Sequence, residues 1–367
     1  MAARAVAVAG LTLVWAFVTA PIVYSGRGVA FDEWIFLDVG RSIAESGLPV
    51  RHYALPEPAM FFDHTPGYVL LSALVAWLPD PLLALRAAGW LAGLGVVLMV
   101  YVTVRGPVGA VVGALTALSP LLMDWSWFAH MEVPMGLAIS VAVWSLARER
   151  LVLAALAVAT AVMFKEFAVG FLAVMAGYVW QTRGPYAALR FVGPSAVVVA
   201  GWFTYAAILD VDQLAATMIR WLSYGVGDGE VRYTGPWLPH VAEQIGTPLV
   251  AVLGVGLVHA RDRLAWWLTL YGGLAILASL VMTTKEPRWL TGVVPATAIA
   301  AGLLLRHFDG AREDDLIARG PGYRIAVAEL AVGRAVRHRR PQDGRDARRH
   351  KPGRHEVRRR ARVDDEP

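Results

Sequence analysis

The sequence predicts an all-α integral membrane protein that crosses the bilayer about ten times. Of its 367 residues, 57% are hydrophobic, and the mean hydropathy is +0.50. A soluble domain is usually about 45–50% apolar. The excess lies in runs of roughly 17–22 residues with few charges, which is about the length that crosses a hydrocarbon core of ~30 Å.

The first predicted span covers residues 3–24, where Arg4 is the only charge. No small-residue cleavage motif followed by a soluble domain comes after it, so we expect an uncleaved span rather than a removed signal peptide. Later apolar runs predict the remaining spans. These cover residues 87–104, 107–123, 133–147, 150–164, 167–182, 190–209, 246–260, 264–283 and 289–305.

Lys and Arg in the short loops indicate the orientation. With the N-terminus in the cytoplasm, every predicted inner loop carries at least one Arg, whereas the outer turn at 124–131 carries none. We therefore predict a multi-pass protein of the plasma membrane whose segments 25–86 and 210–245 lie on the extracytoplasmic side. The inner arginines are Arg105, Arg148, Arg150, Arg183, Arg190, Arg261, Arg263 and those of the C-terminal tail.

The outer segment 25–86 is too long for a simple turn, and we expect interfacial helices within it. Residues 34–46 fit an amphipathic helix along the membrane surface. Residues 66–79 ("PGYVLLSALVAWLP") are apolar, but a run of that length is more often interfacial or re-entrant than spanning. Gly, Pro, Trp and Tyr in the second outer segment, 210–245, predict an ordered loop.

Charge divides the chain near residue 305. Residues 306–367 hold 17 of the 34 Lys and Arg and 11 of the 29 Asp and Glu, so the remainder has a net charge of −1 against +5 for the whole chain. We predict a membrane domain over 1–305 and a disordered cytoplasmic tail over 306–367. The tail suits contact with anionic lipids. Apart from Phe308 and Tyr323, no Phe, Tyr or Trp lies among its arginines for base stacking, so no nucleic-acid partner is expected.

Ionisable residues gather at the predicted outer face, where the helices begin and end. Singly, each is most simply an interfacial anchor or a helix cap. Their convergence on one face favours a functional site, because ionisable groups at membrane depth are energetically costly. The set is Asp32, Glu33, Asp63, His64, Arg86, His130, Glu132, Lys165, Glu166, Lys285, Glu286 and Arg288.

Acids and bases at one face suit a reaction that removes a proton and stabilises a phosphate. A partly desolvated carboxylate with cations nearby can act as a general base toward a hydroxyl group. Lys binds phosphate as a point charge, and Arg binds it as a two-pronged donor. An apolar groove beside such a site could hold the chain of a lipid-linked phosphate. The chain has no cysteine, which excludes thiol catalysis and cysteine metal sites.

Short motifs follow one another along residues 1–305. They are "DEW" (32–34), "SGLPV" (46–50), "FFDHTPGYVLL" (61–71), "ALRAAGWLAG" (84–93), "MEVPMG" (131–136), "MFKEFA" (163–168) and "PRWL" (287–290). Their order resembles that in the GT-C superfamily of membrane glycosyltransferases, and it is most similar to the dolichyl-phosphate-mannose protein mannosyltransferases and the bacterial lipid A aminoarabinose transferases. Gly67, Glu132 and Trp289 stand where those families more often have Pro, Asp and Tyr.

The resemblance implies that residues 1–305 form the catalytic domain of an inverting glycosyltransferase. Its donor would be a dolichyl- or undecaprenyl-phosphate sugar, and its acceptor a protein, lipid or glycan. Asp32 would deprotonate the acceptor. Lys165 and Arg288 would bind the donor phosphate, with Arg86 and Lys285 as further candidates.

The same resemblance implies that Glu33, Asp63, His64 and Glu132 orient the acceptor or the sugar. No cofactor is expected. A divalent cation is the open alternative, since Asp32, Asp63, His64 and Glu132 offer the carboxylate and imidazole ligands that such ions accept.

Two other classes of protein remain as alternatives. A transporter or lipid flippase would have polar residues near the bilayer midplane and paired inverted halves, whereas the predicted spans here are almost free of ionisable residues. A non-catalytic assembly partner would tolerate the loss of Asp32. The sequence has no P-loop and no glycine fingerprint for a dinucleotide, so a nucleotide-sugar donor is disfavoured.

Overall fold

The computed structural model describes residues 2–25, 28, 30–226, 236–259, 262–281 and 287–318, and it confirms the all-α prediction. Its elements are α1 (Ala2–Tyr24), α2 (Phe31–Ser46), β1 (Val50–Arg51), β2 (Ala59–Met60), α3 (Gly67–Val75), α4 (Pro81–Val104), α5 (Gly106–Ala117), α6 (Pro120–Ser126), α7 (Glu132–Ala147), α8 (Leu151–Phe164), α9 (Ala168–Arg183), α10 (Pro185–Val226), α11 (Trp237–Ile245), α12 (Thr247–His259), α13 (Arg263–Val281), the 3-10 helix η1 (Pro287–Leu290) and α14 (Val293–Ala318).

Every predicted span coincides with a helix or a pair of helices, but the structure does not establish that ten of them cross the membrane. Among the described residues, four helices are long and apolar enough to cross a membrane: α1, α4, α10 up to Arg220, and α13 up to Leu280. The pair α5 and α6, bent by 60°, makes a fifth if it is one broken span. Helices α7, α8 and the first part of α14 are apolar but shorter. The chain is therefore an integral membrane protein whose count of ten spans stays a prediction.

Helix α4 begins earlier than the predicted residue 87. The Asp80 carboxylate accepts a hydrogen bond of 2.9 Å from the Leu83 amide, and Pro81 follows at the first helical position, where its missing N–H does no harm. Arg86 therefore lies inside the helix, more than a turn from its start, rather than ahead of it.

Helix α10 differs most from expectation. Its backbone breaks at Asp210, which has φ −164° and ψ 93°, at the predicted end of the span 190–209. The Asp210 carboxylate accepts from the Gln213 amide at 2.9 Å, and this cap restarts the helix. The segment 210–226, predicted as a loop, is thus helical, and α11 occupies much of the rest of that segment.

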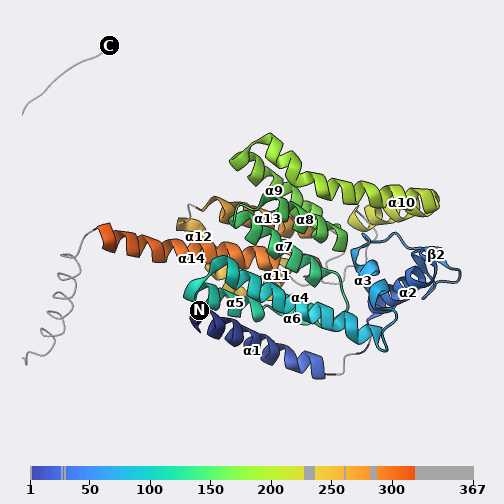
Figure 1. Ribbon diagram of the computed structural model, residues 1–367, viewed down its shortest axis with the longest axis horizontal. Helices are drawn as coiled ribbons and strands as arrows, with labels where there is room; N and C mark the ends of the chain where they lie inside the picture. The colour runs from blue at the N-terminus through green and yellow to red at the C-terminus, as the bar shows by residue number, and fades with distance from the viewer. Residues whose placement is uncertain are drawn as a thin grey trace, which may run out of the picture. The chain divides into compact units, whose positions relative to one another are not determined.

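The outer segment holds the expected interfacial helices. Helix α2 packs on α3 and contacts α4. In the sequence, the short antiparallel pair β1–β2 lies between α2 and α3. A small apolar core beneath α2 includes Phe36, Val39, Tyr68 and Leu85. Figure 1 shows this region at the end of the bundle where α4 begins. The core fixes the first turn of α2, which carries Asp32 and Glu33, against the bundle.

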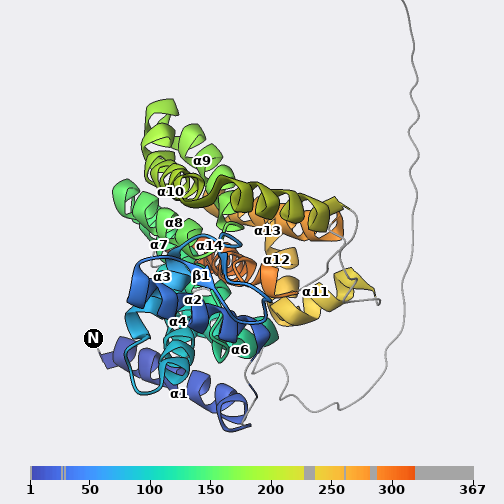
Figure 2. The same ribbon diagram turned by 90° about the vertical axis from the view of Figure 1, so that its right-hand side faces the viewer.

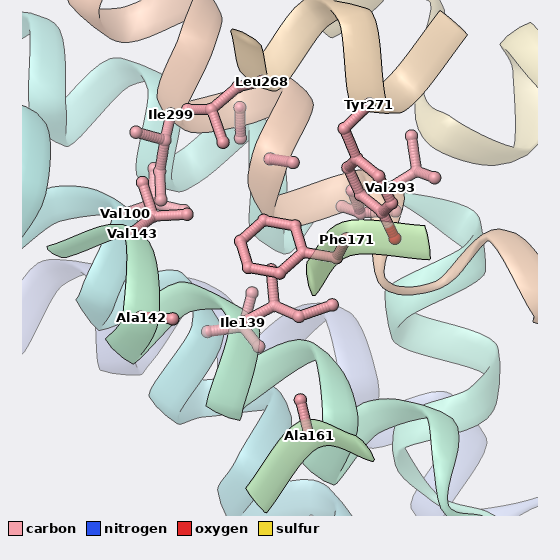
Figure 3. Close-up of a cluster of buried hydrophobic side chains, with 14 of the residues drawn as sticks. Val100, Ile139, Ala142, Val143, Ala161, Phe171, Leu268, Tyr271, Val293 and Ile299 are labelled. Carbon is pink, nitrogen blue, oxygen red and sulfur yellow. The ribbon is translucent and has the colours of Figure 1, made fainter. Parts of the chain in front are cut away.

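The main core lies among α4, α7, α8, α9, α13 and α14. Helix α7 packs against both α8 and α4, while α10 covers α8 and α9, as Figure 2 also shows. In Figure 3, Ile139 and Val143 of α7 point toward Phe171 of α9 and Ile299 of α14. Small residues let these helices approach closely, as is usual in membrane bundles.

Helix α14 continues to Ala318, past the predicted boundary at residue 305. Residues Met1–Ala311 form one compact unit, and the last turns of α14 belong to a second unit, Arg312–Pro367. Residues 319–367, most of the predicted tail, lie outside the described residues.

The close approach of α3 to α8 gives a test of this packing. A Cβ atom on Gly67 would lie 2.6 Å from the backbone oxygen of Met163, so Gly67→Ala forces the two backbones apart. We expect a loss of about 1–3 kcal/mol in unfolding free energy, measured as a lower thermal midpoint in detergent. Gly170→Ala is the control, because a Cβ there meets nothing within 4 Å. Equal midpoints for both variants would contradict the packing described.

Candidate active site

Glu33 lies at the start of α2 and is fully buried. Its Oε1 accepts hydrogen bonds from Arg86 Nε at 2.9 Å and the Ala129 amide at 2.7 Å. Its Oε2 accepts from Arg86 Nη2 at 2.8 Å and the Ala30 amide at 2.7 Å. Arg86 also donates to the Gly28 carbonyl at 2.9 Å. One carboxylate thus joins the start of α2 to α4 and to the loop before α7.

These bonds control the ionisation of Glu33. Burial raises the pKa of the Glu33 carboxyl, but the hydrogen bonds from Arg86, Ala129 and Ala30 outweigh burial and hold that pKa below its ordinary value. Glu33 is therefore ionised at neutral pH and forms a buried ion pair with Arg86. Both residues were predicted to contact substrate, and the structure shows them engaged with each other.

Asp32, the neighbour of Glu33, lies at the surface of the site with a side chain that is 34% exposed. Arg288, presented by η1, donates to Asp32 Oδ2 at 2.6 Å, although 256 residues separate the two. The guanidinium of Arg288 also lies 5.6 Å from the centre of the Trp125 ring. Sequence reasoning placed Asp32 and Arg288 on one face, and the structure brings them into direct contact.

Arg288 keeps Asp32 in the form that can accept a proton. Burial raises the pKa of the Asp32 carboxyl, but the charge and hydrogen bond of Arg288, with the charges of His130 and His64, lower it below its ordinary value. The carboxylate is therefore ionised at neutral pH.

Glu132, the first residue of α7, lies buried at the centre of the site. Its Oε1 is 3.5 Å from Lys165 Nζ and 4.0 Å from Arg288 Nε. Its Oε2 is 3.6 Å from His130 Nδ1 and, among the described residues, makes no hydrogen bond. His130 Nδ1 in turn lies 3.3 Å from Arg288 Nη1. The two predicted phosphate-binding cations therefore share one buried acid.

Glu166 and His64 extend the site on the Lys165 side. Glu166 Oε1 lies 3.4 Å from His64 Nδ1 and 3.8 Å from Lys165 Nζ. Burial raises the pKa of the Glu166 carboxyl, but Lys165 and His64 outweigh burial and lower it to about 2. Burial and the charge of Lys165 lower the pKa of the His64 imidazole, which favours its neutral form. Neither carboxylate oxygen of Glu166 makes a hydrogen bond in the described part of the chain.

Asp63 pairs with Arg220, a residue of the part of α10 that lies beyond the kink. This contact links the loop before α3 to α10 next to the site. Arg220 was not among the predicted site residues, because it falls in a segment that was expected to be a loop. Only its place in a run of ionisable and aromatic residues, "RWLSY", could have drawn attention to it.

Five predicted residues thus form one charged cluster: Asp32, His64, Glu132, Lys165 and Arg288. His130 and Glu166 belong to it as well, and sequence reasoning had noted both without giving either a role. Lys285 lies outside the described residues. Within the described ranges, no group of three or more His, Asp or Glu side chains is arranged to hold a metal ion.

Of two apolar cavities in this part of the molecule, the first is lined by a residue of the cluster. One of about 460 Å³ lies between α9 and α13, is lined by residues such as Val174 and Leu274, and reaches Glu166 and Trp289. The other, of about 350 Å³, lies where α2, α3, α8 and α10 meet and is walled in part by Trp202. Apolar space thus borders charged groups, an arrangement that fits an amphiphilic ligand.

No protein-family model matches the sequence, and no curated protein matches it. Solved structures do match it. ArnT from Cupriavidus metallidurans bound to undecaprenyl phosphate superposes with a TM-score of 0.62 at 20% identity, over 83% of this chain and 60% of that chain. Apo ArnT from the same organism gives 0.61 at 20% identity over the same shares. AglB from Archaeoglobus fulgidus, in complex with an inhibitory peptide and a dolichol-phosphate, gives 0.54 at 10% identity, over 89% of this chain and 54% of that chain.

The chain has the GT-C fold. ArnT is a lipid A aminoarabinose transferase and AglB an oligosaccharyltransferase, and both are GT-C proteins. The resemblance inferred from the sequence motifs is therefore confirmed for the fold. This chain spans 60% of the length of the ArnT chains and 54% of the AglB chain.

The buried Glu33–Arg86 pair gives a stability test. Glu33→Gln keeps the shape of the side chain but removes the carboxylate that pairs with Arg86, and breaking a buried pair in this way costs about 3–5 kcal/mol. We expect a clearly lower thermal midpoint in detergent. Glu45→Gln, an exposed change in the same helix, should leave the midpoint unchanged. The losses of unfolding free energy in Glu33→Gln, Arg86→Met and the double variant measure the coupling between the two residues. If the loss in the double variant equals the sum of the two single losses, the residues are not coupled.

Proposed function

We propose that this GT-C chain is an inverting glycosyltransferase. It moves a sugar from a polyprenyl-phosphate donor, such as dolichyl or undecaprenyl phosphate, to a protein, lipid or glycan acceptor. The reaction takes place on the extracytoplasmic side of the plasma membrane. The fold supports this proposal, since ArnT and AglB are GT-C transferases whose solved structures hold undecaprenyl phosphate and dolichol-phosphate.

The observation that carries the proposal is the composition of the charged cluster. In this cluster Asp32, which is ionised and 34% exposed, pairs with Arg288. The buried carboxylate of Glu132 lies within 4.0 Å of both Arg288 and Lys165. The cluster also presents carboxylate oxygens of Glu132 and Glu166 that make no hydrogen bond within the described residues. A sugar phosphate needs both kinds of group, because cations bind its phosphate and carboxylates accept hydrogen bonds from its hydroxyl groups.

The reaction follows from these positions. Asp32 accepts the proton of the acceptor's nucleophile, which forms a bond to the anomeric carbon. The bond from that carbon to the phosphate oxygen breaks, and the polyprenyl phosphate leaves with the electron pair. Lys165 and Arg288 stabilise its negative charge. Attack from the face opposite the leaving group inverts the anomeric centre.

The remaining predicted residues take supporting roles. Glu132 and His64 orient the sugar or the acceptor, and Asp63 helps to enclose them through its contact with Arg220. We assign Glu33 and Arg86 to positioning Asp32 rather than to contact with substrate, because each is already engaged by the other. The polyprenyl chain lies in the cavity between α9 and α13, which begins next to Trp289. No cofactor is required in this scheme, and a divalent cation that binds with the donor phosphate is compatible with it.

The direct test is transfer itself. Purified protein is incubated with radiolabelled polyprenyl-phosphate sugars and membrane extract, and the labelled product is identified. We expect wild-type protein to label an acceptor and Asp32→Asn to lose about 10²–10⁴ in rate, with an unchanged thermal midpoint. Wild-type turnover in Asp32→Asn would remove Asp32 as the base. Movement of the donor across vesicle membranes without labelled product would support a transporter or flippase instead.

The dependence of rate on pH tests the Asp32–Arg288 contact. Asp32 acts in its ionised form, so kcat/KM falls as pH drops through the pKa of Asp32, which lies below the ordinary ~3.9. Arg288→Met removes the main influence that lowers this pKa and leaves burial, which raises it. We expect the acid limb of kcat/KM to move to higher pH.

Arg220→Met is the control for this pH profile, because it removes a cation next to the site that pairs with Asp63 rather than Asp32. Its acid limb should match that of the wild type. An unshifted limb in Arg288→Met would show that Arg288 does not set the ionisation of Asp32.

A further inference from the structure

The end of the bundle opposite Asp32 carries a basic cavity that the proposed reaction does not use. Helix α8 shows the separation, since Lys165 of the active-site cluster follows its last residue while Arg150 precedes its first. The cavity measures about 910 Å³. Its lining includes four arginines at the ends of α4, α7, α9 and α13 and one within α14: Arg105, Arg148, Arg183, Arg263 and Arg306.

The positive charge of this cavity is only partly balanced. Two acids, Glu149 and Asp262, also line it, so arginines outnumber carboxylates. Arg183 donates to the backbone carbonyl of Glu149 at 3.2 Å, and Arg148 donates to that of Val102 at 3.4 Å. Within the described residues, none of the five arginines forms an ion pair with a carboxylate.

Like charges also crowd one another here. Partial desolvation and the charges of Arg105, Arg150 and Arg4 lower the pKa of the Arg148 guanidinium. A bound anion would relieve this repulsion. Guanidinium groups suit phosphate in particular, because their planar donors match two of its oxygens at once.

A second, mainly apolar cavity of about 570 Å³ adjoins the first. It lies among α1, α4, α5 and α7, where Ala7, Tyr101 and Trp144 line it, and it shares Arg105 and Arg148 with the basic cavity. The excess of Lys and Arg on cytoplasmic loops explains arginines at this end. It does not explain why they line a concave site that continues into apolar space.

We propose that these two cavities form a binding site for an anionic membrane lipid. The phosphate headgroup binds among the arginines of the larger cavity, and one acyl chain lies in the apolar cavity between α1 and α7. Basic pockets between transmembrane helices on the cytoplasmic side are suited to such headgroups. This site is independent of the reaction proposed for Asp32.

Native mass spectrometry of the purified protein in detergent tests the proposal. Phosphatidylglycerol and phosphatidylcholine of the same acyl chains are titrated separately. We expect at least one tight phosphatidylglycerol site in the wild type. In Arg105→Gln/Arg148→Gln, affinity for phosphatidylglycerol should fall roughly 25-fold, about fivefold for each basic residue removed, with little change for phosphatidylcholine.

The control is Arg41→Gln/Arg190→Gln, which removes the same charge from two arginines that line neither cavity. It should keep wild-type affinity, and an equal loss would show non-specific attraction and overturn the proposal. Arg105→Lys/Arg148→Lys keeps the charge and should retain most of the binding, so a loss as large as that of the Gln variant would also overturn it. Displacement of the lipid by millimolar inorganic phosphate would overturn the lipid assignment in favour of a free-phosphate site.

Discussion

The rest of the candidate site depends on the buried carboxylate of Glu33. A charge without water is stable only if every lone pair finds a donor, and here the donors come from Arg86 of α4, the Ala129 amide and the start of α2 itself. None of these segments can move independently without leaving a buried charge unsatisfied. The first turn of α2 is therefore fixed. Asp32 is fixed with it, because it directly precedes Glu33 and is rotated from it by roughly 100° about the helix axis.

The charged cluster of the candidate site is assembled from helix ends, while the helices themselves supply rigidity. Glu132 begins α7, Lys165 directly follows α8, and Arg288 lies in η1 just before α14. Between those ends the helices pack through alanine and branched aliphatic side chains, with Phe171 and Tyr271 among them (Figure 3). The bilayer excludes polar groups from the helix interiors, so chemistry can be placed only where helices begin and end. The same constraint explains why the basic cavity lies at their opposite ends.

Much of this arrangement could be predicted from the sequence, because hydropathy marks where helices run and arginines mark which ends share a side. Asp32, Lys165 and Arg288 were placed on one face for that reason. Which acid contacts which base could not be predicted, since Asp32 and Arg288 are 256 residues apart and pairing depends on packing. The Gly, Pro, Trp and Tyr content of segment 210–245 predicted a loop there rather than the second half of α10, so Arg220 was missed. The mutual engagement of Glu33 and Arg86 was missed because neighbouring residues such as Asp32 and Glu33 look alike in sequence but face different surroundings.

Glu132, shared by Lys165 and Arg288, has a consequence for turnover. Both cations are already neutralised by acids before any anion arrives, so a phosphate that enters must compete with Glu132 and Asp32 for them. In the proposed reaction, the gain on association is therefore smaller than two unpaired cations would give, and the lipid phosphate that leaves would be correspondingly easier to release. A tighter site would retain this product, so the internal ion pairs would favour rapid exchange of the lipid carrier over strong retention.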